Sequence, residues 1–192
     1  MRPPNAPSLL EATHSSDASD YQERINAALA DLGIPLELVR KRGLPLCFEA
    51  EELIVAETDS LGREHRLAPA AAHAWREMKA AAHADGVGLQ IVSAFRSFDR
   101  QVDIVRRKIE AGQTVEEILS VSAPPGYSEH HTGCAVDIGT SGCDSLEEVF
   151  EQSQAFAWLT ENAAPYGFFM SFPRDNAYGY RHEPWHWAHR KA

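Results

Sequence analysis

Two short segments, far apart in the chain, gather residues whose side chains can bind metal ions or transfer protons. The first covers residues 128–137 with the sequence SEHHTGCAVD, and the second covers residues 183–187 with the sequence EPWHW. Each segment contributes at least one histidine and one carboxylate. A catalytic zinc site needs such a combination, with three histidine or carboxylate ligands, a position left for water and a nearby base. A fold that uses these residues together must bring both segments to one place.

From these residue types we predict that zinc is bound by His130, Asp137 and His186. Glu183 lies three residues before His186 and is left free to act as the general acid/base. Pro184 interrupts strand pairing beside it and lets Glu183 turn toward the water position. This set of ligands and base is typical of a metallopeptidase. Residues 182–186 read HEPWH, but we expect them on a strand, whereas a thermolysin-like site presents both histidines of an H-E-x-x-H motif on one helix. The thermolysin-like arrangement is therefore excluded, but zinc hydrolysis is not.

The spacing within the first segment requires a bend in the backbone. His130 and Asp137 are seven positions apart, so they cannot share one helical face. An odd separation also places them on opposite faces of a regular strand. Gly133 offers the bend, and we predict a loop that carries His130 through Gly133 into a short strand ending near Asp137. His186 then comes from a neighbouring strand.

Three further histidines lie beside the expected ligands and are alternatives to them. His131 is adjacent to His130, so one of the two faces the metal and the other lies outside its coordination shell. In a strand, His182 shares a face with His186, so parity alone allows it as a ligand. For His131, His182 and His189 we favour structural roles, or contacts that orient the metal ligands from outside the coordination shell, because most histidines are hydrogen-bonded structural residues.

The composition of the chain limits the kinds of binding partner and the cellular compartment that can be expected. The formal net charge of -10 argues against a nucleic-acid partner, because such partners need clustered Lys and Arg. Cys47, Cys134 and Cys143 form no CxxC pair, which favours free thiols over a disulfide framework or a cysteine-bound zinc. The sequence contains no apolar stretch typical of a secretory signal or a membrane span. As written, the chain is expected to be cytoplasmic, or periplasmic or at the cell wall if a leader is missing.

The pattern of elements predicts one domain over residues 21–192, preceded by a flexible segment over residues 1–20. Helices are expected over residues 20–31, 69–85, 98–111, 114–119 and 146–162. Strands are expected over residues 89–95, 135–138, 167–172 and 180–188, with a small hairpin that turns at residues 59–62. This mixture predicts an α+β fold, in which helices flank a small antiparallel sheet that carries the zinc site.

Three blocks of the sequence resemble the D-alanyl-D-alanine metallocarboxypeptidases, a family that shares its zinc scaffold with D-Ala-D-Ala dipeptidases and hedgehog-type domains. Residues 128–137 are similar to the signature S-x-H-x-x-G-x-A-x-D of that family. Residues 180–187, with the sequence YRHEPWHW, resemble its closing E-x-W-H block. Residues 93–97 together with Gln101 resemble its S-x-[YF]-R-S segment. The resemblance is strongest over residues 85–190, and the VanY-type branch fits best.

The resemblance implies the same three ligands, one zinc ion per chain and the same base. It also implies that Arg96 stabilises the oxyanion or holds the substrate, and that Ser128 and Gln101 contact the substrate's terminal residue. Phe95 departs from the pattern, because it stands where the family more commonly has tyrosine.

The function implied by the resemblance is that of a zinc-dependent D,D-carboxypeptidase. Such an enzyme hydrolyses the C-terminal D-Ala-D-Ala bond of peptidoglycan-type peptides, so stem peptides or muropeptides are the expected partners. An L,D-carboxypeptidase or a D,D-dipeptidase on the same scaffold is an alternative, and a non-catalytic zinc-binding module is another. Glu183 favours catalysis, because a binding module has no need of a base beside the water.

Overall fold

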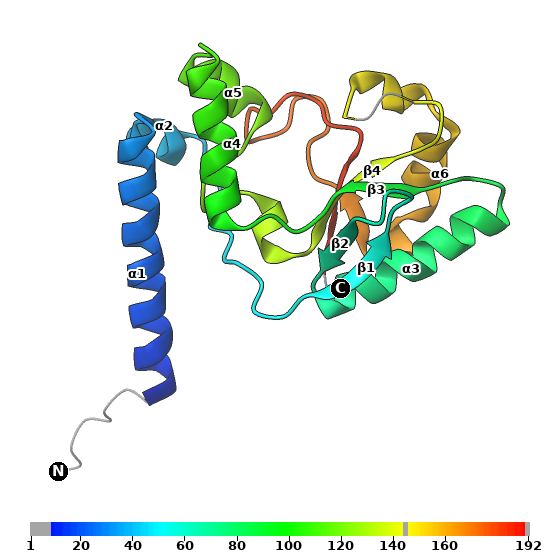
Figure 1. Ribbon diagram of the computed structural model, residues 1–192, viewed down its shortest axis with the longest axis horizontal. Helices are drawn as coiled ribbons and strands as arrows, with labels where there is room; N and C mark the ends of the chain where they lie inside the picture. Colours follow the sequence, from blue (N-terminus) through cyan, green and yellow to red (C-terminus); the bar gives the residue numbers. More distant parts are fainter. Residues whose placement is uncertain (1–8, 144–145, 191–192) are drawn as a thin grey trace.

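The computed structural model describes residues 9–143 and 146–190 and centres on a four-stranded antiparallel sheet (Figure 1). The strand order is β3-β4-β6-β5, and the strands are β3 (Gln90–Ser93), β4 (Ala135–Gly139), β5 (Phe168–Met170) and β6 (His186–His189). A separate antiparallel hairpin consists of β1 (Ile54–Thr58) and β2 (Glu64–Leu67). The predicted α+β class, the antiparallel sheet and the hairpin are confirmed.

Helices lie around the sheet in two groups. The α-helices are α1 (Leu9–Asp31), α2 (Leu36–Lys41), α3 (Pro69–Ala84), α4 (Phe98–Glu110), α5 (Val115–Val121) and α6 (Gln154–Asn162). Three 3-10 turns are η1 (Glu129–Thr132), η2 (Glu148–Gln152) and η3 (Ala164–Tyr166). Figure 1 shows α3 and α6 next to the sheet, whereas α1, α2, α4 and α5 gather at the opposite end of the molecule. No helix in the described part of the chain is both long and apolar enough to cross a membrane.

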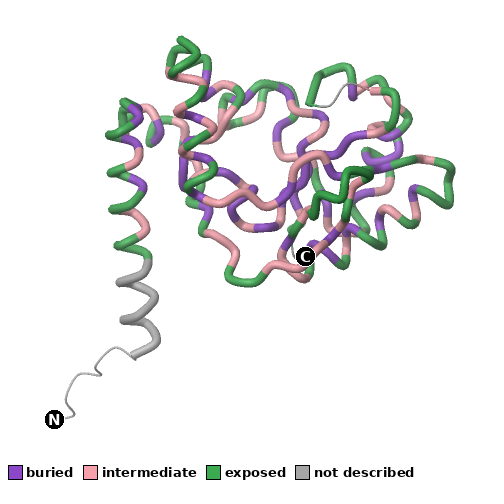
Figure 2. The backbone as a smooth tube through the Cα atoms, in the orientation of Figure 1, coloured by how far each residue is buried: buried purple, intermediate pink, exposed green. Residues whose placement is uncertain are grey.

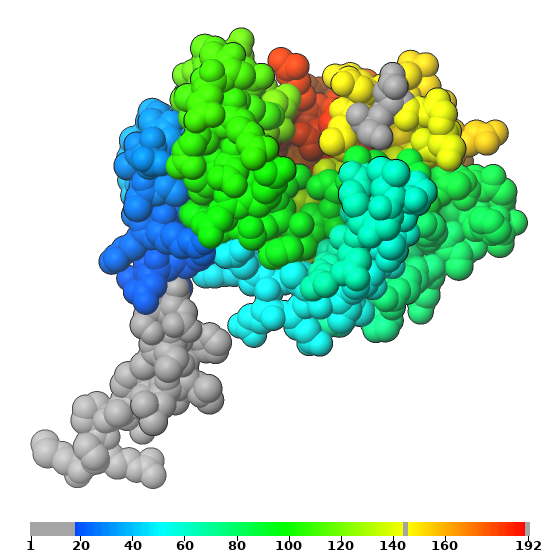
Figure 3. Space-filling model, viewed as in Figure 1, coloured from blue at the N-terminus to red at the C-terminus, as the bar shows by residue number. Residues whose placement is uncertain are grey.

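Each group of helices has its own apolar core (Figure 2). In α3, Trp75 and Met78 recur at helical spacing and are fully buried against the sheet, together with Phe168 of β5. In the second core, Ile25 of α1 and Val105 of α4 are fully buried. Figure 3 shows α1 lying directly against α4. The site described below lies where these two halves of the molecule meet.

Helix boundaries follow the sequence well where capping signals are strong. Ser97 caps α4 by accepting a hydrogen bond from the backbone N–H of Arg100, and Thr114 forms a capping box with Glu117 at α5. The helix expected over residues 146–162 is instead divided into η2 and α6. Ser153 is extended and caps α6, which ends the preceding turn at that point.

The N-terminal helix and the last strand differ from expectation. The first helix begins at Leu9 rather than near residue 20, and the flexible segment over residues 1–20 stays a prediction, since residues 1–8 lie outside the described residues. The strand expected over residues 180–188 is confined to β6. Before it, the side chain of Asn176 bonds the backbone of Tyr178 and Tyr180, so this loop is held by a side chain rather than by a strand ladder.

Candidate metal centre

The central sheet aligns two of the predicted ligands. Asp137 of β4 lies opposite Ser93 of β3 on one side and opposite His186 of β6 on the other. Directly opposed residues of an antiparallel pair project from the same face of the sheet. The register therefore places these three side chains in one row across three strands. The neighbouring-strand position predicted for His186 is confirmed.

Gly133 turns the chain so that His130 returns to this row. Its φ of 65° lies in the left-handed region, which favours glycine. A Cβ atom at Gly133 would lie 2.9 Å from the backbone nitrogen of Ala68 and 2.9 Å from Leu53 Cδ2. Because the turn leaves no room for a side chain, a larger residue would displace η1, which carries His130. The bend predicted at this glycine is confirmed.

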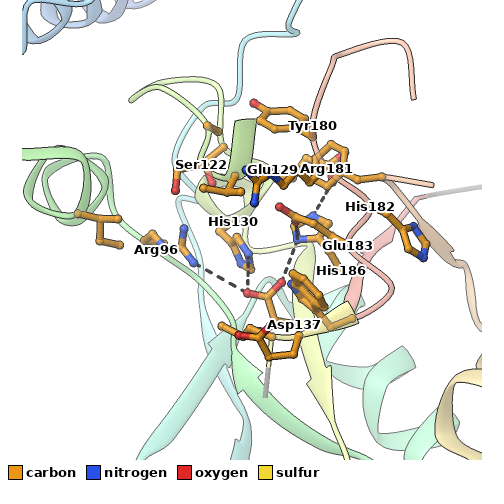
Figure 4. Close-up of a pocket in the computed structure, with 18 of the residues that line it drawn as sticks. Arg96, Ser122, Glu129, His130, Asp137, Tyr180, Arg181, His182, Glu183 and His186 are labelled. Carbon is orange, nitrogen blue, oxygen red and sulfur yellow. Dashed lines mark hydrogen bonds and ion pairs between the residues drawn. The ribbon is translucent and has the colours of Figure 1, made fainter. Parts of the chain in front are cut away.

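The three predicted ligands converge (Figure 4). His130 Nε2 lies 3.2 Å from Asp137 Oδ2, and His186 Nδ1 lies 2.9 Å from Asp137 Oδ1. One ligand atom from each residue lies within 4.8 Å of the others, and all three residues are buried. Within the described residues this is the only such group. Zinc bonds of about 2.0–2.2 Å in tetrahedral geometry separate ligand atoms by about 3.3–3.6 Å, so the donor set fits zinc.

The two histidine rings are held in place by their other nitrogen atoms. His130 Nδ1 donates to the carbonyl oxygen of Ala94 at 2.7 Å, which leaves the Nε2 lone pair facing Asp137. Burial lowers the pKa of His130 and favours its neutral form. Two acceptors 3.2 Å apart repel each other unless a cation lies between them. The geometry of this pair is thus suited to a bound metal ion.

His186 contacts a carboxylate at each ring nitrogen. Nδ1 faces Asp137, whereas Nε2 donates to Glu129 Oε2 at 2.9 Å. Although burial lowers the pKa of His186, these hydrogen bonds raise it to about 10. Burial raises the pKa of Asp137, but the neighbouring His130 and His186 outweigh this and hold it well below its usual range. A metal ion at this site would take the place of the proton on His186 Nδ1.

Glu129 is a functional candidate that sequence reasoning missed. Its carboxylate orients the ring of His186 from outside the ligand set, as acidic partners of zinc-binding histidines commonly do. Although burial raises the pKa of Glu129, the hydrogen bond from His186 lowers it below the usual value. The only sequence signal for this role is its place beside His130 in the metal segment.

Glu183 lines the cavity above the ligands, as predicted for a base. Its Oε2 lies 3.9 Å from His186 Nδ1, and its backbone N–H donates to the carbonyl oxygen of Phe172. A turn, closed by a hydrogen bond from the His186 N–H to the Glu183 carbonyl, joins the two residues. Burial raises the pKa of Glu183 to about 7, although the charge of His186 opposes this rise. A carboxylate with this pKa can both accept and return a proton near neutral pH.

Arg96 reaches the same cavity from the loop before α4. One nitrogen atom donates to Gln101 Oε1 at 3.0 Å, and another donates to Ser93 Oγ at 3.1 Å and lies 4.0 Å from Asp137 Oδ2. Gln101 is fully buried, and its Nε2 donates to the carbonyl oxygen of Ala123 at 2.6 Å. Gln101 therefore lies behind Arg96 and orients it. Its direct contact with substrate stays a prediction.

The three alternative histidines lie outside the ligand group. His131 Nδ1 donates to the carbonyl oxygen of Arg96 at 2.6 Å, and its Nε2 accepts from the N–H of Gly126 at 3.2 Å. Both ring nitrogen atoms of His131 thus form hydrogen bonds with backbone groups. His182 lies in the loop before β6, with Nε2 3.5 Å from a carboxylate oxygen of Glu151, and the ring of His189 packs against Phe168.

A cavity of about 460 Å³ opens above the metal group. Ser128 lines it, as expected for a residue that contacts substrate, and so do Arg96 and Glu183. In Figure 4, Ser122 and Arg96 lie on one side of His130, away from His182. The cavity is large enough for the end of a short peptide.

Sequence comparison shows which known proteins this chain resembles. Residues 64–191 match the family model described as "VanY: D-alanyl-D-alanine carboxypeptidase". The chain is 33% identical over 159 residues to the putative carboxypeptidase YodJ of Bacillus subtilis, covering 79% of this chain and 58% of that protein. It is also 33% identical over 119 residues to a D-alanyl-D-alanine carboxypeptidase of Enterococcus faecalis, covering 57% and 42%. The chain thus spans about half the length of these curated relatives.

Solved structures show the same fold. The LD-carboxypeptidase LdcB superposes with a TM-score of 0.67 at 31% identity, covering 76% of this chain and 71% of that one. A variant of the D,D-pentapeptidase VanY in complex with Zn(II) gives a TM-score of 0.58 at 29% identity, covering 76% and 82%. VanYB in complex with D-alanine-D-alanine gives 0.59 at 30% identity, covering 76% and 80%.

Proposed function

The chain belongs to the VanY D-alanyl-D-alanine carboxypeptidase family, and from this premise we propose that it is a zinc-dependent D,D-carboxypeptidase. Its substrate would be the C-terminal D-Ala-D-Ala bond of peptidoglycan-type peptides, such as muropeptides. The observation that carries the proposal is the buried group of His130, Asp137 and His186 with Glu183 in the same cavity. The zinc and dipeptide complexes of similar proteins agree with it.

The residues of the cavity have complementary roles in this reaction. Zinc held by the three ligands would supply Lewis acidity, polarising the peptide carbonyl and lowering the pKa of water toward about 7. Glu183 accepts a proton from the attacking water and delivers it to the departing amine, so that a C–O bond forms as the C–N bond breaks. Arg96, beside Asp137, stabilises the negative charge that develops on the carbonyl oxygen.

A second candidate is supported by the likeness to LdcB. An L,D-carboxypeptidase would remove a terminal D-alanine from a tetrapeptide rather than from a pentapeptide, with the same ligands and base. The similarity to LdcB extends over 76% of this chain. A zinc-binding module without turnover is less well supported, because Glu183 is a partly buried carboxylate in the cavity and burial raises its pKa to about 7.

Muropeptides that differ in length distinguish these candidates. Purified, zinc-loaded protein is incubated with tripeptide, tetrapeptide and pentapeptide forms, and the products are identified by mass spectrometry. We expect the pentapeptide to lose one D-alanine, and we expect a chelator to stop the reaction until zinc is restored. Loss of D-alanine from the tetrapeptide alone would favour the L,D-carboxypeptidase. An intact pentapeptide and tetrapeptide would overturn the proposed function.

A further inference from the structure

Lys108 is a half-buried cation on the wall of the metal-site cavity. It projects from α4, two helical turns after Gln101, so it lies on the same side of this helix as the residue that orients Arg96. Its Nζ donates to Ser122 Oγ at 2.6 Å, and Ser122 lines the cavity as well. No carboxylate of the described residues forms an ion pair with Lys108.

Lys108 has a single hydrogen-bond partner and no salt bridge among the residues that the structure describes. Its ammonium group has three N–H donors, and Ser122 Oγ is its one acceptor among the residues that the structure describes. Burial lowers the pKa of Lys108, the charge of Glu183 raises it, and the charge of Arg96 adds to the lowering. A partly desolvated cation of this kind is stabilised by an incoming anion.

Arg96 differs from Lys108 in this respect. Its guanidinium already donates to Ser93 and Gln101 and lies 4.0 Å from Asp137 Oδ2. These contacts fix Arg96 beside a metal ligand, where the carbonyl group to be cleaved must lie. The two cations thus occupy different parts of one cavity, and Lys108 has N–H donors that no described residue accepts.

We propose that Lys108 and Ser122 bind the C-terminal carboxylate of the peptide substrate. The inference rests on the proposed carboxypeptidase function and names the residues that make the enzyme act only at a free chain end. A carboxypeptidase must distinguish a terminal carboxylate from an internal amide, and a partly desolvated ammonium beside a hydroxyl group does this through charge-assisted hydrogen bonds. Arg96 is then free to stabilise the oxyanion.

A structural role for Lys108 would have a different signature. Its bond to Ser122 also tethers the loop that leads to Ser128 and η1. Loss of such a tether would disturb the binding of every ligand in the cavity to the same degree. Loss of a carboxylate-binding group would weaken only ligands that carry a terminal carboxylate. A matched pair of peptides therefore separates the two roles.

The experiment compares a peptide ending in D-Ala-D-Ala with its C-terminal amide. KM and kcat are measured for the acid, and the amide is measured as a competitive inhibitor, so that its affinity is obtained whether or not it is cleaved. Lys108→Met should raise KM for the acid about 10–100-fold, the effect of one lost charged hydrogen bond, and leave the Ki of the amide within about twofold. Lys108→Arg keeps the charge and should retain most of the preference for the acid. Arg107→Met, which removes an exposed cation from the neighbouring position, is the control.

Each result is decisive once zinc content and melting temperature confirm that the variants are folded. A selective loss of affinity for the acid supports the inference. An equal change for acid and amide, or no change for the acid, overturns it while the wild-type activity still supports the proposed function. Absence of cleavage by the zinc-loaded wild-type protein would overturn the proposed function, and the inference with it.

Discussion

Replacing Glu129 should weaken zinc binding without removing a ligand. Glu129 Oε2 accepts a hydrogen bond from His186 Nε2 at 2.9 Å, and its other oxygen lies 3.9 Å from a guanidinium nitrogen of Arg190. This contact fixes the ring so that Nδ1 points at the metal position, and the negative charge makes the imidazole a stronger ligand. Without it, part of the binding free energy must be used to order the ring.

The size of the effect follows from the kind of contact that is lost. Outer carboxylate partners of metal-binding histidines typically contribute about 10–100-fold in metal affinity, or about 1.4–2.7 kcal/mol. Glu129→Gln keeps an oxygen acceptor and loses only the charge, so it should fall at the lower end. Glu129→Ala leaves the Nε2 proton of the buried His186 without a partner and should fall at the upper end.

Zinc affinity is measured by competition with a chromogenic chelator at fixed pH and ionic strength. Glu116→Ala provides the control, since it removes an exposed carboxylate from the first turn of α5 and should leave zinc affinity unchanged. Wild-type affinity in Glu129→Ala would refute the reasoning, because it would show that His186 is oriented for zinc without Glu129.

Three further predictions concern the ligands, the turn and protonation. Alanine at His130, Asp137 or His186 should lower zinc content, measured by elemental analysis. Gly133→Ala should destabilise the fold by about 1–3 kcal/mol, visible as a lower melting temperature, because a left-handed turn would carry a Cβ 2.9 Å from the Ala68 nitrogen. Zinc binding near pH 7 should release a proton from His186, whose pKa is raised to about 10, so calorimetric heats should depend on the buffer and affinity should rise with pH.

The opposite results are equally clear. Undiminished zinc in a variant that lacks all three ligands would show that the metal binds elsewhere. An unchanged melting temperature for Gly133→Ala would mean that the strand or the hairpin gives way at little cost. A heat of zinc binding that is independent of the buffer would show that His186 is already neutral in the metal-free protein.

The raised pKa of His186 also affects the stability of the metal-free fold. Protonated His186 stabilises this fold fully below about pH 6.5, and the contribution is lost as the pH rises through about 10.

The grouping of His130, Asp137 and His186 was predictable because it depends on residue type and local backbone chemistry. His130 and Asp137 are joined through a glycine that only a left-handed turn explains, and the strand after it is short and apolar. The starts of the helices expected over residues 98–111 and 114–119 also lie close to those of α4 and α5, which Ser97 and Thr114 cap in the structure. These features are local, so the sequence carries them without knowledge of the fold.

The remaining parts of the site depend on contacts between distant segments. The parity argument for His182 assumed a regular strand over residues 180–188, but side-chain bonds from Asn176 hold that region as a loop. Glu129 could be assigned only once His186 was seen to face it from another strand. The contact of Gln101 with Arg96 also depends on distant segments, because it is set by how α4 packs against the loop at Ala123, while the expected contact of Gln101 with substrate stays a prediction.

The most direct test of the account is to remove the base while keeping the metal. Glu183→Ala is prepared with zinc, its metal content is measured, and its cleavage of a pentapeptide ending in D-Ala-D-Ala is compared with that of the wild-type protein. We predict one zinc ion per chain in both proteins. We also predict a loss of about a hundredfold or more in kcat for Glu183→Ala. The other described carboxylates of the cavity either belong to the ligand group, contact its histidines, or lie farther from His186 Nδ1, so none of them can replace the base. A Glu183→Ala protein that binds zinc and cleaves at the wild-type rate would contradict the central claim.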